Sequence, residues 1–239
     1  GNIYSRLGNP TVGALEARLT ALEEGAMCVA LSSGTSAVMY SLINIMSQGD
    51  NFVTANQLYG GTYTMFDNIL PEYGIDSKKV DITDLAAVES AIDDKTRAIY
   101  CETITNPGLV VADISALSDI AHSKGIPLIV DATFTTSAIL KPFEYGADIV
   151  VYSLTKWMSG HGRVIAGAVI EKGGFDWGNG NFPLYDKPDT SYGGMRWGHD
   201  LGDLGNVAYS LRLRTVPLRN LGANMGPETA FEVLSGLET

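Results

Sequence analysis

One lysine of the sequence stands in an unusual place for a charged residue. Lys156 follows the segment 149–155, whose residues IVVYSLT are typical of a buried strand. Lysines normally lie on the surface, and desolvation makes a lysine amine a nucleophile toward carbonyl groups. Ser153 and Thr155 alternate with Leu154, so both hydroxyls face one side if the strand continues. Lys156 is therefore a candidate catalytic nucleophile, and we expect its surroundings to desolvate it.

Two other polar segments follow predicted strands. Ser33, Gly34 and Thr35 separate an apolar run from a helical pattern, and small residues there let the backbone approach a ligand closely. The free N–H groups and the positive end of a helix favour a phosphate, although an ordinary strand–helix turn has the same composition. Asp131 ends the apolar segment 127–130, where a carboxylate costs free energy unless a cation or a hydrogen-bond donor meets it. A helix cap or a salt bridge is the alternative role for Asp131.

Together, the lysine, the carboxylate and the phosphate loop indicate one cofactor, pyridoxal phosphate (PLP). PLP needs a lysine amine for a Schiff base, a carboxylate that keeps the pyridine nitrogen protonated, and a loop that holds the phosphate. The protonated ring is an electron sink, which stabilises a carbanion beside the substrate nitrogen. The three features are more specific in combination than each is alone.

The pattern along the chain predicts the elements that must bring these residues together. Helical periodicity and strand-sized apolar runs alternate, and several strands lack polar positions, which is typical of a mostly parallel sheet covered by helices. In such sheets ligands bind beyond the carboxyl ends of the strands. We predict strands at 27–31, 52–55, 98–102, 127–131, 149–153 and 164–170. We predict helices at 11–23, 36–47, 62–73, 84–92, 115–124, 201–214 and 227–237, with an irregular connection at 175–197.

The composition argues against several other classes of protein. The 239 residues, 45% hydrophobic and 18% charged, fit one large globular domain or slightly more. The 16 basic and 27 acidic residues give a net charge of −11, which argues against binding to nucleic acid or an anionic membrane. Cys28 and Cys101 form neither a disulfide framework nor a zinc-site spacing, so no metal is predicted and a cytoplasmic location is expected. Because the chain starts at Gly1 rather than at methionine, we expect it to be part of a longer one.

Several ordered motifs resemble the Cys/Met metabolism family of PLP-dependent enzymes, and the resemblance covers essentially the whole chain. The motifs are Tyr4-Ser5-Arg6, Asn9-Pro10-Thr11, Ser33-Gly34-Thr35, Leu58-Tyr59-Gly60-Gly61-Thr62, Glu102-Thr103, Asn106-Pro107, Asp131 and Ser153-Leu154-Thr155-Lys156. The resemblance implies an α/β chain with PLP-dependent transferase fold type I, which is aspartate-aminotransferase-like and has a mostly parallel seven-stranded sheet. It also implies an N-terminal arm at 1–10, a PLP-binding large domain at 11–215, and at 216–239 the start of a C-terminal domain that is otherwise missing.

The resemblance further implies roles for individual residues. Lys156 would form the Schiff base and shuttle protons, Asp131 would pair with the pyridine nitrogen, and Tyr59 would stack on the ring and assist proton transfer. The implied phosphate-binding residues are Ser33, Gly34, Thr35, Ser153 and Thr155. Asn106 would contact the ring hydroxyl oxygen or the substrate side. Tyr4 and Arg6 would reach the phosphate of a neighbouring subunit, so the protein would be a homo-oligomer, either a dimer with shared active sites or a tetramer.

Within the family, the chain is most similar to the O-acetylhomoserine sulfhydrylase branch of methionine biosynthesis. That branch replaces the acetate of O-acetyl-L-homoserine with sulfide or a small thiol, giving homocysteine or methionine. Methionine γ-lyases commonly have a cysteine where this chain has Gly61, which counts against a lyase. A methionine γ-lyase, a cystathionine γ-synthase or γ-lyase, and a truncated PLP-binding fragment without turnover are the alternatives. Ala132 and Arg163 depart from the family pattern, and the chain stops before the arginine that binds the substrate carboxylate in this family.

Overall fold

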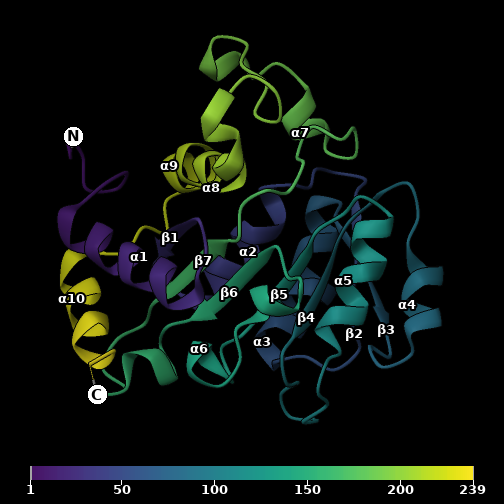
Figure 1. Ribbon diagram of the computed structural model, residues 1–239, viewed down its shortest axis with the longest axis horizontal. Helices are drawn as coiled ribbons and strands as arrows, with labels where there is room; N and C mark the ends of the chain where they lie inside the picture. The colour runs from purple at the N-terminus through teal and green to yellow at the C-terminus, as the bar shows by residue number, and fades with distance from the viewer. Residues whose placement is uncertain (1, 239) are drawn as a thin grey trace.

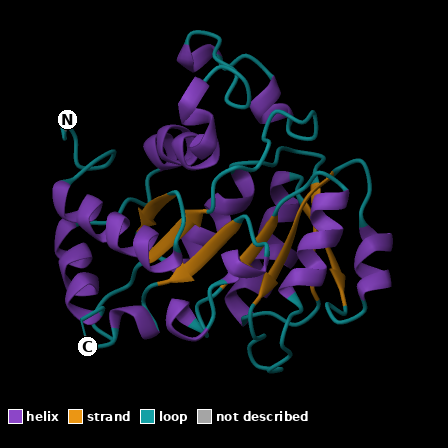
Figure 2. Ribbon diagram, in the orientation of Figure 1, coloured by secondary structure: helices purple, strands orange, loops and turns teal. Residues whose placement is uncertain are grey.

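Seven strands form a single sheet at the centre of the molecule (Figure 2). The computed structural model describes residues 2–238. The strand order is β1-β7-β6-β5-β4-β2-β3. β7 runs antiparallel to both of its neighbours, and the other strands run parallel to one another. The strands are β1 (Met27–Leu31), β2 (Asn51–Ala55), β3 (Asp76–Val80), β4 (Thr96–Glu102), β5 (Leu128–Asp131), β6 (Ile149–Ser153) and β7 (Gly167–Glu171). The predicted α/β class with a mostly parallel seven-stranded sheet is confirmed.

Helices pack on both faces of this sheet (Figure 2). They are α1 (Pro10–Glu23), α2 (Gly34–Ile43), α3 (Gly60–Thr64), α4 (Leu85–Ala91), α5 (Ile114–Ser123), α6 (Thr136–Ile139), α7 (Pro183–Asp186), α8 (Ala208–Leu213), α9 (Arg219–Leu221) and α10 (Pro227–Gly236). Single π-helical turns occupy Met65–Ile69 and Arg214–Leu218. Short 3-10 turns occupy Leu70–Tyr73, Pro142–Tyr145, Trp157–Ser159, Thr190–Tyr192 and Gly202–Val207. No helix within residues 2–238 is both long and apolar enough to cross a bilayer.

The predicted elements differ from the observed ones mainly at their ends and at one strand. The prediction missed β3, because its residues DSKKV lack an apolar run and the strand lies at the sheet edge, paired only with β2. The helix predicted at 36–47 begins two residues earlier and ends at Ile43. The strand predicted at 164–170 begins only at Gly167, because Ile165 is exposed and outside the sheet. The connection predicted to be irregular at 175–197 contains short helical turns.

The parallel strands place several loops along one edge of the sheet. The central strands β4, β5 and β6 are almost wholly buried, which explains their unbroken apolar sequences. Because β2, β4, β5 and β6 point the same way, the segments that follow them gather at one edge, the lower one in Figure 1, where α3 and α6 lie. This edge is where the sequence predicts the cofactor.

The C-terminal part of the chain packs back on the first helix. α10 lies against α1 and against the turn Trp157–Ser159 (Figure 1). Residues 208–221 form one continuous helical run, which includes Pro217. The domain boundary predicted between residues 215 and 216 falls inside this run and stays a prediction.

Candidate active site

The loop between β1 and α2 ends in a well-formed helix N-terminus. Ser33 is the N-cap of α2, and its hydroxyl oxygen accepts the N–H of Ser36 at 3.0 Å. The Ser36 hydroxyl in turn accepts the N–H of Ser33 at 3.1 Å, which completes a capping box. The N–H groups of Gly34 and Thr35 in the first turn have no acceptor within the helix. They are therefore free to bind an anion, as the sequence predicts.

This helix N-terminus lies directly against the ends of β6 and β7. A Cβ atom added at Gly34 would lie 2.5 Å from the Cβ and 2.8 Å from the Oγ of Ser153. One added at Gly167 would lie 2.1 Å from the carbonyl oxygen of Ser33. Both glycines are thus required by the close approach of the backbones. The contact brings the Ser153 hydroxyl to the amides of α2, and a hydroxyl beside a helix N-terminus suits a phosphate group.

The segment after β6 does not continue as a strand, so the condition under which Ser153 and Thr155 would face one side is not met. β6 ends at Ser153, and the chain turns so that the Lys156 N–H donates to the Ser153 carbonyl at 3.2 Å. The Thr155 hydroxyl instead donates to the carbonyl of Ala166 at 3.2 Å and accepts the Ala166 N–H at 3.0 Å. Thr155 therefore fastens this turn to the segment before β7.

Lys156 itself is exposed, which corrects the expectation that its surroundings desolvate it. A lysine that follows a buried strand is delivered to the sheet edge, where the turn carries the side chain out of the core. No carboxylate among residues 2–238 forms an ion pair with its amine. The amine is thus accessible, and the described chain does not desolvate it.

Asp131 ends β5 as a partly buried carboxylate that meets donors but no cation. Its Oδ1 accepts the N–H of Thr133 at 2.9 Å, and its Oδ2 accepts the hydroxyl of Tyr100 at 3.3 Å. Burial raises the pKa of the Asp131 carboxyl above its ordinary range. No Lys or Arg within residues 2–238 forms an ion pair with it. The protonated pyridine nitrogen of PLP would supply the missing positive charge, so the surroundings of Asp131 fit the cofactor.

Thr133 connects Asp131 to the phosphate loop. Its N–H donates to Asp131, and its hydroxyl accepts the N–H of Ser153 at 2.8 Å. Ser153 in turn contacts Gly34 at the start of α2. A continuous set of contacts therefore joins the predicted ring site and the predicted phosphate site.

Glu102 is a buried carboxylate to which the sequence reasoning gave no role. It ends β4 opposite Asp131 of β5 and is only 6% exposed. Its two oxygens accept the N–H groups of Tyr59 at 2.7 Å and Asn106 at 3.0 Å. Burial, opposed by these hydrogen bonds and aided by nearby Asp131, raises the pKa of Glu102 to about 7. The signal was the same as for Asp131, a carboxylate at the end of an apolar strand.

Tyr59 and Asn106 are brought to the same edge by these bonds. Tyr59 precedes α3 and is 49% exposed, and Asn106 is exposed in the loop after β4. A Cβ added at Gly61 would lie 2.7 Å from the ring of Tyr59, so the small residue at position 61 makes room for that ring. Tyr59 is therefore accessible from solvent, as a residue that stacks on a cofactor requires.

Tyr4 and Arg6 do not join the other candidates within this chain. The Arg6 guanidinium donates to the Arg219 carbonyl at 2.7 Å and lies 5.1 Å from the centre of the Tyr4 ring. In residues 2–238 no hydrogen bond or ion pair links either residue to Lys156. The start of α1, which follows these residues in the chain, lies away from α3 and α6 (Figure 1).

The two departures from the family pattern have simple surroundings. Arg163 forms an ion pair with Glu232 of α10 at 3.6 Å. Ala132 is fully buried, and its N–H donates to the Val151 carbonyl of β6. Arg163 thus contacts the last helix, whereas Ala132 belongs to the packing between β5 and β6.

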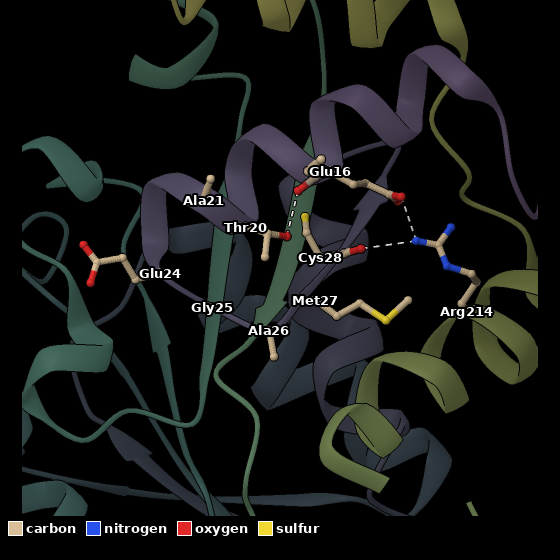
Figure 3. Close-up of a pocket in the computed structure, with 10 residues that line it drawn as sticks. Glu16, Thr20, Ala21, Glu24, Gly25, Ala26, Met27, Cys28 and Arg214 are labelled. Carbon is tan, nitrogen blue, oxygen red and sulfur yellow. Dashed lines mark hydrogen bonds and ion pairs between the residues drawn. The ribbon is translucent and has the colours of Figure 1, made fainter. Parts of the chain in front are cut away.

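A surface groove of about 540 Å³ opens elsewhere, between α1 and β1 (Figure 3). None of the predicted site residues lines it. Glu16 of α1 accepts the Ala30 N–H at 2.9 Å and forms an ion pair with Arg214 at 2.8 Å, and Arg214 donates to the Cys28 carbonyl. These bonds satisfy outward backbone groups of the edge strand β1, so this region protects a sheet edge.

Comparison with known proteins decides the family. The chain matches the Cys/Met metabolism PLP-dependent enzyme family over residues 1–239. The chain belongs to this family. Membership confirms the resemblance found in the sequence, and it confirms PLP as the cofactor of the family.

Individual relatives in the Cys/Met metabolism family agree with this assignment. The chain is 43% identical over its whole length to O-acetyl-L-homoserine sulfhydrylase of Leptospira meyeri and to homocysteine synthase of Schizosaccharomyces pombe, and it covers 55% and 56% of those proteins. It therefore spans about half the length of these relatives.

Two solved structures share the fold. A structure described as O-acetylhomoserine (thiol)-lyase from Campylobacter jejuni, with a pyridoxyl-lysine phosphate, has a TM-score of 0.95 and 40% identity. The alignment covers 100% of this chain and 59% of that one. Cystathionine γ-lyase from Lactobacillus plantarum, in complex with L-serine, has a TM-score of 0.79 and 32% identity, over 99% of this chain and 53% of that one. These matches confirm the predicted fold class.

Proposed function

We propose that the protein catalyses γ-replacement on O-acetyl-L-homoserine, in which sulfide or a small thiol displaces acetate. The products would be homocysteine or methionine. One observation carries the proposal: contacts through Thr133, Ser153 and Gly34 connect the Asp131 carboxylate to the α2 N-terminus, with Lys156 three residues after Ser153. Relatives that share 43% of the sequence are named for this chemistry, which favours it over the other reactions of the family.

The residues at this edge suit distinct tasks around PLP. When bound, PLP supplies the electron sink that acidifies the carbon positions of an amino-acid substrate. The Gly34 and Thr35 amides and the Ser153 hydroxyl hold the phosphate, with the Ser33 cap fixing the helix end. Thr155 holds the turn that presents Lys156.

Around the ring, four further residues act from the end of β5 and from the neighbouring loops. Asp131 keeps the proton on the pyridine nitrogen, helped by a Tyr100 hydroxyl that orients the carboxylate. Lys156 binds the cofactor and carries protons between substrate carbons, since its amine is accessible. Tyr59 offers an exposed ring for stacking, and Asn106 lies beside it through the Glu102 bonds.

The complete active site is a property of a homo-oligomer. Tyr4 is exposed, and within residues 2–238 neither Tyr4 nor Arg6 is bonded to the candidate site, which is consistent with both reaching a neighbouring subunit's phosphate. Residues 1–10 then form an arm, 11–215 the PLP-binding domain, and 216–239 the start of a C-terminal domain that completes the substrate site. The substrates are small water-soluble molecules, and the cytoplasm is the proposed location.

Product analysis tests this function. We expect acetate release from O-acetyl-L-homoserine to require added sulfide or thiol, and we expect Lys156→Ala to abolish both turnover and the near-visible absorption of lysine-bound PLP. Lys172→Ala is the matched control, because Lys172 is also exposed and directly follows a strand, β7.

Other products would assign another reaction. Ammonia and a 2-oxo acid formed without added thiol would identify elimination, as in a γ-lyase. Bound PLP without any turnover would identify a fragment that binds the cofactor only. An unchanged absorption band in Lys156→Ala would overturn the site assignment.

A further inference from the structure

Glu102 lies where burying a carboxylate costs free energy. It is 6% exposed, and no Lys or Arg within residues 2–238 forms an ion pair with it. It also lies beside a second carboxylate, because the register of β4 and β5 pairs it with Asp131. Two like charges at adjacent strand ends repel, and an apolar residue would satisfy the core at lower cost. The stability of the fold therefore does not explain why a carboxylate occupies position 102.

The contacts of Glu102 supply that reason. Its Oε1 accepts the Tyr59 N–H at 2.7 Å, and its Oε2 accepts the Asn106 N–H at 3.0 Å. Tyr59 belongs to the loop between β2 and α3, and Asn106 belongs to the loop after β4. One carboxylate thus joins two loops that are more than forty positions apart in the sequence, and each oxygen serves one loop.

The two loops also touch each other next to these bonds. A Cβ added at Gly108 would lie 1.6 Å from the side-chain oxygen of Gln57 and 3.3 Å from the hydroxyl of Thr105. Thr105 accepts the Val110 N–H through its hydroxyl and the Leu109 N–H through its carbonyl, so the second loop is bonded within itself. The Asn106 loop is therefore held together by its own bonds, and Glu102 joins it to the Tyr59 loop.

We propose that Glu102 is a positioning residue that clamps the Tyr59 loop to the Asn106 loop and so fixes both side chains for the cofactor ring. Only the roles of Tyr59 and Asn106 beside the cofactor rest on the proposed function. The clamp itself depends on two hydrogen bonds and the glycine contact. Glu102 touches neither substrate nor cofactor in this role, and its effect passes through the two backbone amides.

The test uses Glu102→Gln and Glu102→Ala, with Glu171→Gln as the matched control. Glu171 is also a buried strand-end carboxylate, 1% exposed, and it accepts the Ser210 N–H and the Trp177 indole N–H. It ends the antiparallel β7 opposite Ile149, so it lies at the other edge of the sheet. Hydrogen exchange at the Tyr59 and Asn106 amides and the dissociation constant for PLP are measured for each variant.

We expect exchange at the Tyr59 and Asn106 amides to accelerate at least tenfold in Glu102→Ala and the PLP dissociation constant to rise at least tenfold. Glu102→Gln keeps one acceptor oxygen, so it should free one amide and weaken PLP less. Glu171→Gln should change neither quantity, whatever it does to the melting temperature. A purely structural role predicts equal effects for Glu102→Gln and Glu171→Gln on PLP affinity, and that result would overturn the clamp.

Amide exchange of the unmutated parent protein also tests the clamp. Rapid exchange of its Tyr59 and Asn106 amides would overturn the proposal even if no Glu102 variant folds. Failure of the proposed function is distinguished by Lys156→Ala: if the parent and this variant bind PLP equally, the function fails while amide exchange still judges the clamp.

Discussion

Replacing Gly34 by alanine isolates the contact that builds the phosphate site. The new Cβ would lie 2.5 Å from the Cβ of Ser153, which is 0.9 Å inside the 3.4 Å where ordinary contact begins. It would also lie 2.8 Å from the Cα of Ser153, a backbone atom of β6. Ser153 cannot retreat, because it pairs with Gly167 of β7 and its N–H is bound to Thr133. The start of α2 must therefore move away from β6.

The matched control is Gly13→Ala, because Gly13 lies in α1 with nothing within 4 Å of its added Cβ. Alanine favours a helix over glycine by roughly 0.5–1 kcal/mol at either site, and the difference between the variants isolates the steric overlap. Overpacking costs about 1–3 kcal/mol, so Gly34→Ala should be less stable than Gly13→Ala by that amount in urea unfolding.

The same displacement should weaken binding of PLP. Moving the amides of Gly34 and Thr35 from the Ser153 hydroxyl breaks up the group that meets the phosphate, and we expect the dissociation constant to rise about tenfold or more, a loss of about 1.4 kcal/mol. Equal stability and equal PLP affinity in the two variants would show that α2 is not held against β6 as described.

Three further predictions concern charges away from the cofactor. Burial raises the pKa of Glu171 from 4.5 to about 7, so the contribution of Glu171 to stability is lost as pH rises through 7. Between pH 5 and pH 8, the free energy of unfolding of Glu171→Gln should therefore rise relative to that of the parent by up to about 3 kcal/mol, measured by denaturant titration. The hydrogen bond to Asp148 raises the pKa of His122, so the bond stabilises the protein most when the imidazole is protonated. His122→Gln should therefore lower the free energy of unfolding at pH 5.5, by less than about 1 kcal/mol for this partly exposed pair, and by less at pH 8.5. Equal losses of stability at both pH values would contradict this. Glu16→Ala removes the ion-pair partner of Arg214 and the acceptor of the Ala30 N–H in β1, so it should cost about 2 kcal/mol in thermal or urea unfolding. An unchanged stability would show that the edge needs no such protection.

Features set by local pattern could be predicted from the sequence. The unbroken apolar runs identified β4, β5 and β6 because these strands are buried on both faces. Asp131 and the loop at Ser33 were found because polar residues directly after such strands must lie at the carboxyl edge of the sheet. The assignment of Tyr4 and Arg6 came from the family resemblance and remains a prediction, because the contacts that would test it involve a second subunit.

Features set by tertiary contacts could not be predicted in this way. Nothing in the residues DSKKV of β3 distinguishes an edge strand from a loop, because an edge strand pairs on one side only. The exposure of Lys156 depends on a turn that Thr155 forms with Ala166, eleven residues later. The role of Glu102 depends on two amides from different loops, and no sequence pattern indicates which backbone N–H groups will donate to a carboxylate.

The comparison of Glu102 with Glu171 shows how direction in the sheet separates function from stability. Both end a strand, both are buried, and burial raises the pKa of each to about 7. β4 is parallel to its neighbours and delivers Glu102 to the edge where the loops after β2, β5 and β6 meet. β7 is antiparallel and delivers Glu171 to the opposite edge, where its partners are Ser210 and an indole N–H. Since chemistry and burial are so alike, only the loops that each carboxylate meets can make one a positioning residue and the other a structural one.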